Sequence, residues 1–492
     1  MTRTTIARPL LRSTRGVVST GHPLATTAGL TALARGGNAV DAAVAAAYVL
    51  MVVLPHACGI GGDALFLVSR DRHSTAFNGS GRIPRHWDGV LATDGAPTAT
   101  VPGAVAALDE AHREYGVLPR SDVMAAAIAA AERGFAVTDD LVAAVARNRG
   151  RLEEYAEAAP YTADRVRPGR VLRQLSLAAT LTRIAEEGPD AFYRGPTAEA
   201  LVAAAQAGGS ALCLADLDEH ETARPVPAMV VLGSSTLTVA PPASQAVLSG
   251  MALRAMATAP TASAERPRAH LLAEALESAF QKRARLSTEP WESVLAEPIT
   301  ITGGPARRLG GARGTTHTTA VAVADGDGTI VSMLLSVFHE FGSAAYIPEL
   351  GFVLNDRMRG LEMAPAFHDR PLHTLSPVIL QHRGSMTALA TPGADAQVQV
   401  IAQCVDGILA EDLPLPEVID RPRWRLQGED LVVEGSMPAA QQDLLSGLGH
   451  RVVVTEPGDR AFGSVVSAGF DFDAKSCFGA ADLRRESTAG AI

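Results

Sequence analysis

The fold of this chain is deduced from residues 315–343, TTHTTAVAVADGDGTIVSMLLSVFHEFGS. After a group of hydroxyl side chains, the run Ala320–Ala324 alternates alanine and valine and is apolar on both faces. Such a run predicts a strand that is buried on both sides. The turn sequence DGDG and a second apolar run, Thr329–Val337, come next, so the stretch predicts a β-hairpin.

The length of the turn decides which hairpin residues face each other. If residues 326–328 form the loop, Thr318 lies opposite Ser336, and a loop of another length would move Ser336 off that face. Two facing hydroxyls at the mouth of a buried hairpin suggest a catalytic site. A threonine is a nucleophile only beside a base, and its own α-amine, with a pKa of roughly 7.7–8.0, is one such base once the preceding peptide bond is cut. Threonine is also common in ordinary strands, so the hairpin alone leaves a structural role open.

The wider pattern resembles the γ-glutamyltranspeptidase family. A threonine seven residues before an Asp-x-x-Gly turn, followed by a second strand and FGS, is typical of that family. The segments GGNAVDAAVAA and PHACGIGGD resemble its amino-terminal part, and the similarity extends over residues 15–485. The resemblance implies an N-terminal-nucleophile hydrolase with an α+β fold, a four-layer αββα sandwich, whose precursor cleaves itself before a threonine.

The resemblance also divides the chain. Residues 1–317 correspond to the large subunit and residues 318–492 to the small subunit, the two portions forming one composite domain whose fragments associate after self-cleavage. Spacing to Asp325 selects Thr318 as the nucleophile. The Thr-Thr-His sequence typical of the family occurs three residues earlier, at Thr315, which is therefore the alternative.

Other site residues carry over from matching positions. Ser336 is expected to orient the nucleophile. The backbone N–H groups of Gly393 and Ala394, at a turn from a strand into a helix, are expected to stabilise the oxyanion, although Ala394 stands where the family has glycine. The resemblance implies no cofactor and no metal, and its partner is a small-molecule amide.

Positions that recognise glutamate in transpeptidases are changed here. In the expected loop Phe77–Arg82, Ser80 replaces the arginine that holds the α-carboxylate, and Arg82 is displaced by two residues. Phe338 replaces an asparagine, and Gly360 replaces the aspartate that holds the α-ammonium. Losing a buried charged partner costs about 3–5 kcal/mol, so recognition of a γ-glutamyl group is doubtful.

HEFGS at 339–343, PLHTLSP at 371–377 and Arg357 look more like the oxamate amidohydrolase branch, which hydrolyses a small amide carrying a carboxylate. Arg357 is expected to hold that carboxylate bidentately, with His373 and Thr374, which replace paired serines, as hydrogen-bond partners. Two alternatives within the family are a true γ-glutamyl hydrolase or transpeptidase, and a secondary-metabolism acylase or amidase with an apolar substrate near Phe338. An alternative of another class is an unprocessed pseudoenzyme or binding protein, favoured by Ala320 where the family has histidine.

Composition narrows the remaining classes. The chain has 492 residues, 47% of them hydrophobic, and a net charge of −10 without a long basic run, which argues against nucleic acid as a partner. Its four cysteines lie far apart, so neither a zinc site nor a disulfide framework is indicated. The start of the sequence lacks the apolar core of a secretory signal, and Val40–Leu54 is too short to span a bilayer. We therefore expect a cytoplasmic protein without a membrane partner, with homo-oligomers an open possibility.

Overall fold

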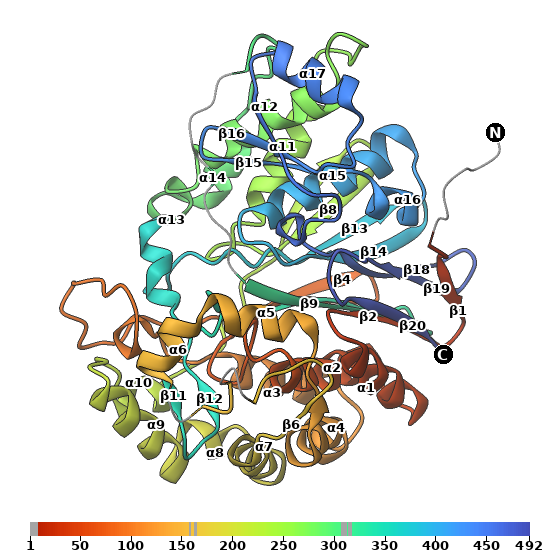
Figure 1. The fold of residues 1–492 in the computed structure, drawn as a ribbon. Coiled ribbons are helices and arrows are strands. Elements are labelled where there is room, and N and C mark those ends of the chain that lie inside the picture. The colour runs from red at the N-terminus through yellow and green to blue at the C-terminus, as the bar shows by residue number, and fades with distance from the viewer. Residues whose placement is uncertain (1–7, 157–158, 162–164, 307–311, 313–316) are drawn as a thin grey trace.

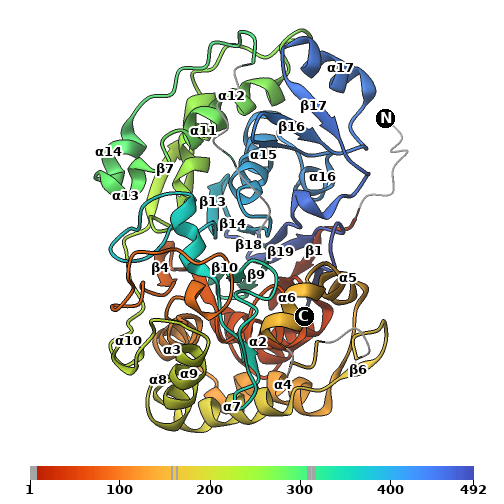
Figure 2. The same cartoon turned by 60° about the vertical axis from the view of Figure 1, so that its left-hand side comes forward.

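The two central sheets lie face to face, and helices cover the outer side of each (Figures 1 and 2). The computed structural model describes residues 8–156, 159–161, 165–306, 312 and 317–492. The layer order is helices, sheet, sheet, helices. This arrangement confirms the predicted four-layer αββα sandwich.

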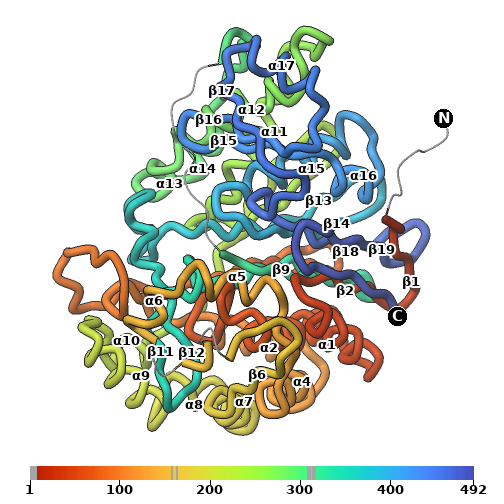
Figure 3. Tube along the Cα trace, viewed as in Figure 1, coloured from red at the N-terminus to blue at the C-terminus, as the bar shows by residue number. Residues whose placement is uncertain are grey.

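The predicted hairpin lies at the centre of a six-stranded antiparallel sheet. The strands follow one another across it in the order β20 (Thr488–Ala491), β2 (Gly16–Thr20), β9 (His317–Asp325), β10 (Ile330–Phe338), β3 (Asp63–Arg70) and β4 (His73–Gly79). The last strand of the chain, β20, runs beside β2, which comes near the beginning of the chain (Figures 1 and 3).

The register of the hairpin agrees with the predicted loop. Asp325 N–H donates to the Thr329 carbonyl, and the pairs run from Ile330–Ala324 to Leu335–Thr319, so Thr318 comes opposite Ser336. The register then shifts, and Phe338 pairs with His317. The described strand β9 thus begins one residue before Thr318.

A seven-stranded antiparallel sheet forms the other central layer. Its order is β1 (Leu11–Ser13), β19 (Ser476–Ala481), β18 (Val466–Asp471), β14 (Ser385–Ala390), β13 (Val378–His382), β8 (Ser235–Val239) and β7 (Ala228–Leu232). Three small sheets lie outside these two layers, formed by β15 (Trp424–Gln427), β16 (Asp430–Val433) and β17 (Arg451–Val454), by β11 (Tyr346–Ile347) and β12 (Phe352–Val353), and by β5 (Phe135–Ala136) and β6 (Val171–Leu172).

Strand β9 is buried on both faces, as its sequence predicts. Val321 and Val323 belong to the apolar core between the six-stranded sheet and its helices. Ala320 and Ala322 belong to the core between the two sheets, where small side chains suit close packing.

The sequence predicts one helix from His22-Pro23 to Arg35 and a second from Asn38 to Val53, and helices α1 (Pro23–Ala34) and α2 (Ala39–Val53) begin and end close to these residues. The N-caps His22 and Asn38 each accept a hydrogen bond from the first turn, as capping residues do. The prediction of a loop over Phe77–Arg82 was wrong at its start, because Phe77–Gly79 still pair with β3 in the strand β4.

The remaining helices complete the outer layers. On the side of the six-stranded sheet lie α3 (Ala104–Tyr115), α4 (Arg120–Arg133), α5 (Asp139–Arg147), α6 (Arg149–Tyr155), α7 (Leu175–Glu187), α8 (Asp190–Tyr193), α9 (Gly195–Ala207) and α10 (Leu214–Asp218) (Figure 1). The other half contains α11 (Val247–Met256), α12 (Arg268–Phe280), α13 (Arg285–Thr288), α14 (Trp291–Ala296), α15 (Ala396–Glu411), α16 (Leu415–Asp420) and α17 (Ala439–Gly447). Short 3-10 helices are η1 (Ala96–Thr98), η2 (Arg357–Glu362) and η3 (Arg460–Phe462).

Both central sheets mix strands from the two predicted portions. In the six-stranded sheet, β2, β3 and β4 precede Thr318 in the sequence, whereas β10 and β20 follow it. The two portions therefore share one hydrogen-bonded core. Of the helices described, none is both long and apolar enough to cross a membrane.

Candidate active site

Three polar side chains form a row across the middle of the six-stranded sheet. Ser336 on β10 is the neighbour of Thr318 on β9 and pairs with Asp63 on β3. Residues paired across strands share a face of the sheet. By strand alternation this is the face of Ala320 and Leu334, which belong to the core between the two sheets. The row therefore faces the other sheet. It lies near the ends of strands β9, β10 and β3, at one end of the layer between the sheets.

Ser336 connects the predicted nucleophile to the peptide bond before it. Its Oγ lies 3.5 Å from Thr318 Oγ1, donates to the His317 carbonyl at 2.9 Å, and accepts from the Phe338 N–H at 2.8 Å. The irregularity of β10 makes this possible, because Phe338 has a φ of +82°, which turns its N–H back to Ser336. The His317 carbonyl is thus already polarised by a hydroxyl.

The predicted oxyanion turn lies close to Thr318. Pro392 and Thr318 line the same cavity, of about 20 Å³. Gly393 and Ala394 have φ values of +127° and +53°, and neither N–H donates to an acceptor in the described part of the chain. Two buried amides that are free of internal partners suit an oxyanion. Thr315, the alternative nucleophile, lies outside the described residues.

Asp63, Arg357 and His373 form a fully buried cluster at the far end of the polar row. Arg357 Nε donates to Asp63 Oδ2 at 2.9 Å and His373 Nε2 lies 3.1 Å from the same oxygen. The Gly81 N–H donates to Asp63 Oδ1. Burial opposes ionisation of Asp63, but His373 and Arg357 outweigh it and hold the pKa of this carboxyl below its ordinary value.

His373 has both ring nitrogens engaged. Its Nδ1 accepts from the Leu375 N–H, and burial, followed by the Arg357 charge, lowers its pKa to about 4. At neutral pH it is therefore an uncharged imidazole that positions Asp63.

Arg357 has hydrogen-bond donors that no described residue uses. Its side chain is 0% exposed, yet Nη1 and Nη2 have no hydrogen-bond partner among the described residues. The Phe338 ring covers the guanidinium at 4.4 Å, and the buried Thr374 Oγ1 likewise lacks a described partner. Because a guanidinium stays charged in proteins, two buried unpaired N–H groups are the chemistry that binds a carboxylate bidentately.

The residues at or beside the positions that recognise glutamate in transpeptidases have surroundings different from those of Arg357. The Ser80 hydroxyl donates to Asn78, at 2.6 Å, and Arg82 is exposed and lines a separate cavity of about 510 Å³ with Trp87 and His220. A Cβ on Gly360 would lie 2.7 Å from the Leu372 carbonyl oxygen, so an aspartate does not fit there without a shift of the backbone.

Sequence analysis missed Asp63 and a charged group near Thr318. The glycine-rich run at 59–62 predicts a turn and Ala64–Ser69 predicts a strand, so the position of Asp63 between them was a usable signal. The charged group consists of His56, Asp140, Arg460 and Arg485, in which Asp140 forms ion pairs with His56 and Arg460. These residues come from separate parts of the chain, and no local pattern marks them.

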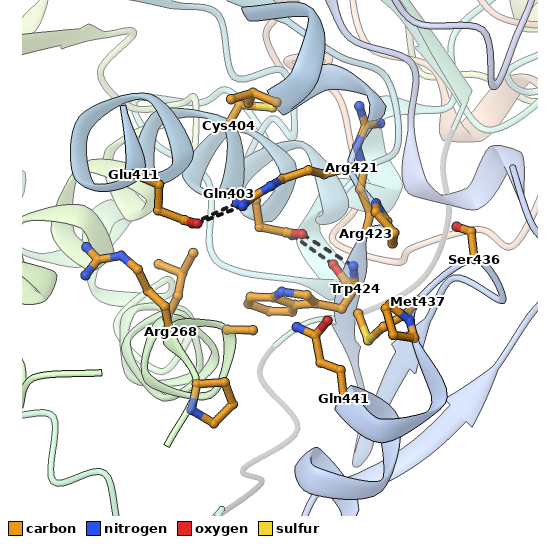
Figure 4. Close-up of a pocket in the computed structure, with 16 residues that line it drawn as sticks. Arg268, Gln403, Cys404, Glu411, Arg421, Arg423, Trp424, Ser436, Met437 and Gln441 are labelled. Atoms are coloured by element: carbon orange, nitrogen blue, oxygen red, sulfur yellow. Dashed lines mark hydrogen bonds and ion pairs between the residues drawn. The ribbon is translucent and has the colours of Figure 1, made fainter. Parts of the chain in front are cut away.

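Another cavity, of about 450 Å³, lies between α12, α15 and β15 (Figure 4). In this cavity Arg421 bonds to Glu411, and Gln403 bonds to the backbone of Trp424. None of the predicted site residues lines it. In the part of the chain described, no group of three or more His, Cys, Asp or Glu residues is arranged to hold a metal ion.

Comparisons with known proteins show what this chain is similar to. The sequence model of the family described as gamma-glutamyltranspeptidase matches residues 25–302 and 295–492. The chain is 32% identical to the oxamate amidohydrolase proenzyme of Klebsiella pneumoniae, over 92% of this chain and 94% of that protein. It is 31% identical to the acylase ACY 1 proenzyme of Pseudomonas sp. strain SE83, over 97% and 94% of the two chains.

A solved structure extends the similarity to the fold. The crystal structure of cephalosporin acylase from Bacillus halodurans superposes with a TM-score of 0.87, at 27% identity, and covers 100% of this chain and 98% of that one.

Proposed function

Because the chain belongs to the gamma-glutamyltranspeptidase family and is an enzyme of its amidohydrolase and acylase kind, we propose that it cleaves itself before Thr318 and hydrolyses a small amide carrying a carboxylate, such as oxamate. The observation that carries the proposal is the buried guanidinium of Arg357, with two terminal N–H groups free of described partners.

The short distance between Thr318 and the cluster of Asp63 and Arg357 supports a small substrate. Neighbouring strands lie about 4.7–4.9 Å apart, so Thr318 and Asp63, two strands apart, are separated by roughly 10 Å. Arg357 bonds to Asp63 and therefore lies within the length of a small molecule of the nucleophile. In oxamate the carboxylate is attached directly to the amide carbonyl, which suits this short span.

In self-cleavage, Thr318 Oγ1 attacks the His317 carbonyl carbon. The Oγ1–C bond forms, the peptide C–N bond breaks, and the hydroxyl proton ends on the nitrogen, while the Ser336 hydroxyl stabilises the carbonyl oxygen. Breaking of the C–N bond frees the α-amine of Thr318. Water then hydrolyses the ester, which frees the Thr318 hydroxyl and leaves a carboxylate on His317. Because strands of both portions share the central sheets, the fragments stay associated.

In substrate hydrolysis, the α-amine accepts the Thr318 hydroxyl proton as Oγ1 attacks the amide carbonyl. The N–H groups of Gly393 and Ala394 stabilise the oxyanion, and the protonated amine gives its proton to the departing ammonia. Water then hydrolyses the acyl-enzyme. Each step uses groups that lie around one end of the inter-sheet layer.

Cleaved enzyme is expected to release ammonia from oxamate and to act poorly on a γ-glutamyl anilide. The changes at Ser80, Phe338 and Gly360 remove contacts that hold the glutamyl group before the transition state as well as in it, so the difference should appear mainly as a raised KM. Steady-state ammonia and aniline assays measure both rates. Efficient γ-glutamyl transfer would contradict the proposal.

A second candidate is an acylase with a larger substrate. The cavity of about 510 Å³ that contains Arg82 and Trp87 begins next to the loop whose Gly81 N–H bonds to Asp63. A long acyl group held at Arg357 could extend toward it. Comparing oxamate with N-substituted and acyl-extended analogues separates the two candidates.

The oxyanion turn allows a matched pair of variants. Gly393→Ala places a Cβ at a φ of +127°, which alanine rarely adopts, and 3.3 Å from the Ala396 Cβ, so the turn should shift and the rate of amide hydrolysis should fall by about 10². Ala394→Gly keeps the N–H and relieves the left-handed conformation, so activity should stay within about twofold. Equal losses in kcat for the two variants would argue against an oxyanion role.

A further inference from the structure

The α-nitrogen of Thr318 faces the β2 side of strand β9. Gly21 N–H donates to the Ala320 carbonyl at 3.1 Å, so the peptide groups of Ala320 point toward β2. In an antiparallel ladder the N–H and C=O of one residue point to the same side and alternate along the strand. The groups of Thr318 therefore also point toward β2, whereas the His317 carbonyl points to Ser336 on β10.

The cavity beside Thr318 opens on the β2 side. It is lined by Thr318 together with residues from six other parts of the chain, namely Gly21, Leu54, His56, Ala57, Asp140, Pro392, Ser464, Arg485 and Ser487. Its volume, about 20 Å³, is close to the size of one water molecule or one amine group. A Thr318 α-amine released by self-cleavage therefore has this small, polar cavity as its surroundings.

Arg485 is the charged group of this cavity that lacks an ion-pair partner. Its Nε and Nη2 donate to the Arg460 carbonyl, and no carboxylate in the described residues accepts a hydrogen bond from it. Burial, followed by the charge of Arg460, lowers the pKa of Arg485 to about 10, so it is still a cation at neutral pH.

The other charges around the cavity are largely neutralised in pairs. Asp140 forms ion pairs with Arg460 and His56. Glu340 accepts from Arg147 and lies 3.1 Å from His317, which becomes the last residue of the large fragment after cleavage. Burial, followed by the charge of His56, lowers the pKa of His22 to about 4, and burial also lowers that of His317. Glu486 accepts from the Asp140 N–H, and burial raises its pKa.

We propose that Arg485 keeps the α-amine of Thr318 in its neutral, proton-accepting form. A nearby like charge disfavours the protonated amine, and enclosure in a cavity of this size acts in the same direction. Arg485 is thus a positioning residue that acts through the amine without contact with the reacting atoms. The inference rests on the proposed function, because the amine exists only after cleavage before Thr318.

The first test needs no substrate. Cleaved protein has two α-amines, that of the first residue and that of Thr318, and trace acetylation across a pH series followed by mass spectrometry titrates both in one sample. The amine of the first residue serves as the internal reference, with an ordinary pKa of roughly 7.7–8.0. We expect the midpoint for Thr318 to be about one pH unit lower. Equal midpoints, or a higher one for Thr318, overturn the inference.

Variants assign the effect to Arg485. Arg485→Met should raise the acid limb of the kcat/KM profile for oxamate, and the acetylation midpoint, by about one pH unit, and Arg485→Lys should restore both. The matched control is Arg383→Met, which removes an exposed arginine that pairs with Asp412 outside the site. If the acid limb of the kcat/KM profile is unchanged in cleaved Arg485→Met, Arg485 does not have the proposed role. If Arg485→Met is not cleaved, the acetylation midpoint of the Thr318 α-amine in the wild-type protein decides whether the inference stands.

Failure of the proposed function and failure of this inference alone would give different results. If no fragment begins at Thr318, the proposed function and this inference fail together. If the fragment forms and hydrolyses oxamate while its α-amine titrates like that of the first residue, only the inference fails.

Discussion

Thr318→Ala is expected to yield one intact chain of 492 residues without measurable amide hydrolysis. The wild-type chain should separate on a denaturing gel into fragments of 317 and 492 − 317 = 175 residues, the second beginning at Thr318. The substitution removes the hydroxyl that attacks the His317 carbonyl, and without cleavage the α-amine does not form. Loss of a nucleophile lowers kcat by about 10³-fold or more. Intact-mass spectrometry and ammonia release measure the two effects.

Three further variants test whether Thr318 or Thr315 is the nucleophile and whether Ser336 assists cleavage. Thr318→Ser keeps a hydroxyl and should still be cleaved, while Ser336→Ala, which loses the donor to the His317 carbonyl, should be cleaved more slowly. Thr315→Ala should be cleaved at the wild-type position. A small fragment that begins at Thr315 in the wild-type protein would transfer the nucleophile role to that residue.

The sequence was sufficient where local chemistry determines the structure. Loop residues 326–328 set the hairpin register, and this register alone brings Thr318 opposite Ser336. The capping residues His22 and Asn38 defined helix starts for the same reason, since their partners lie within one turn. The strand–turn–helix at Gly393 likewise follows from adjacent residues.

Contacts between distant segments could not be derived in this way. Asp63 bonds to Arg357 and His373, which follow it by 294 and 310 residues, and no spacing rule connects them. The Ser80 hydroxyl is directed by Asn78 near the end of β4, which accepts its hydrogen bond. Arg485 comes near Thr318 because β20, which follows it in the chain, pairs with β2 at the edge of the sheet.

Arg357 is the residue on which substrate choice should depend most strongly. Arg357→Met is expected to lower kcat/KM for oxamate by about 10³, chiefly through KM, because truncating one partner of a buried charge pair costs about 2–5 kcal/mol. Self-cleavage should proceed, since it involves no substrate carboxylate. Pyruvamide, in which a methyl ketone replaces the carboxylate, is the matched neutral substrate, and its hydrolysis should change little.

The same substitution also weakens the protein, and a second variant separates the two effects. Arg357→Met leaves Asp63 with only His373 and the Gly81 N–H, and removing one partner of a buried ion pair destabilises by about 3–5 kcal/mol. Arg357→Lys keeps a cation for Asp63 but loses the forked pair of terminal N–H groups, so thermal stability should largely return while the oxamate KM stays raised. Parallel losses on oxamate and pyruvamide, or a normal oxamate KM in Arg357→Lys, would mean that Arg357 serves the buried cluster and that another group binds the carboxylate.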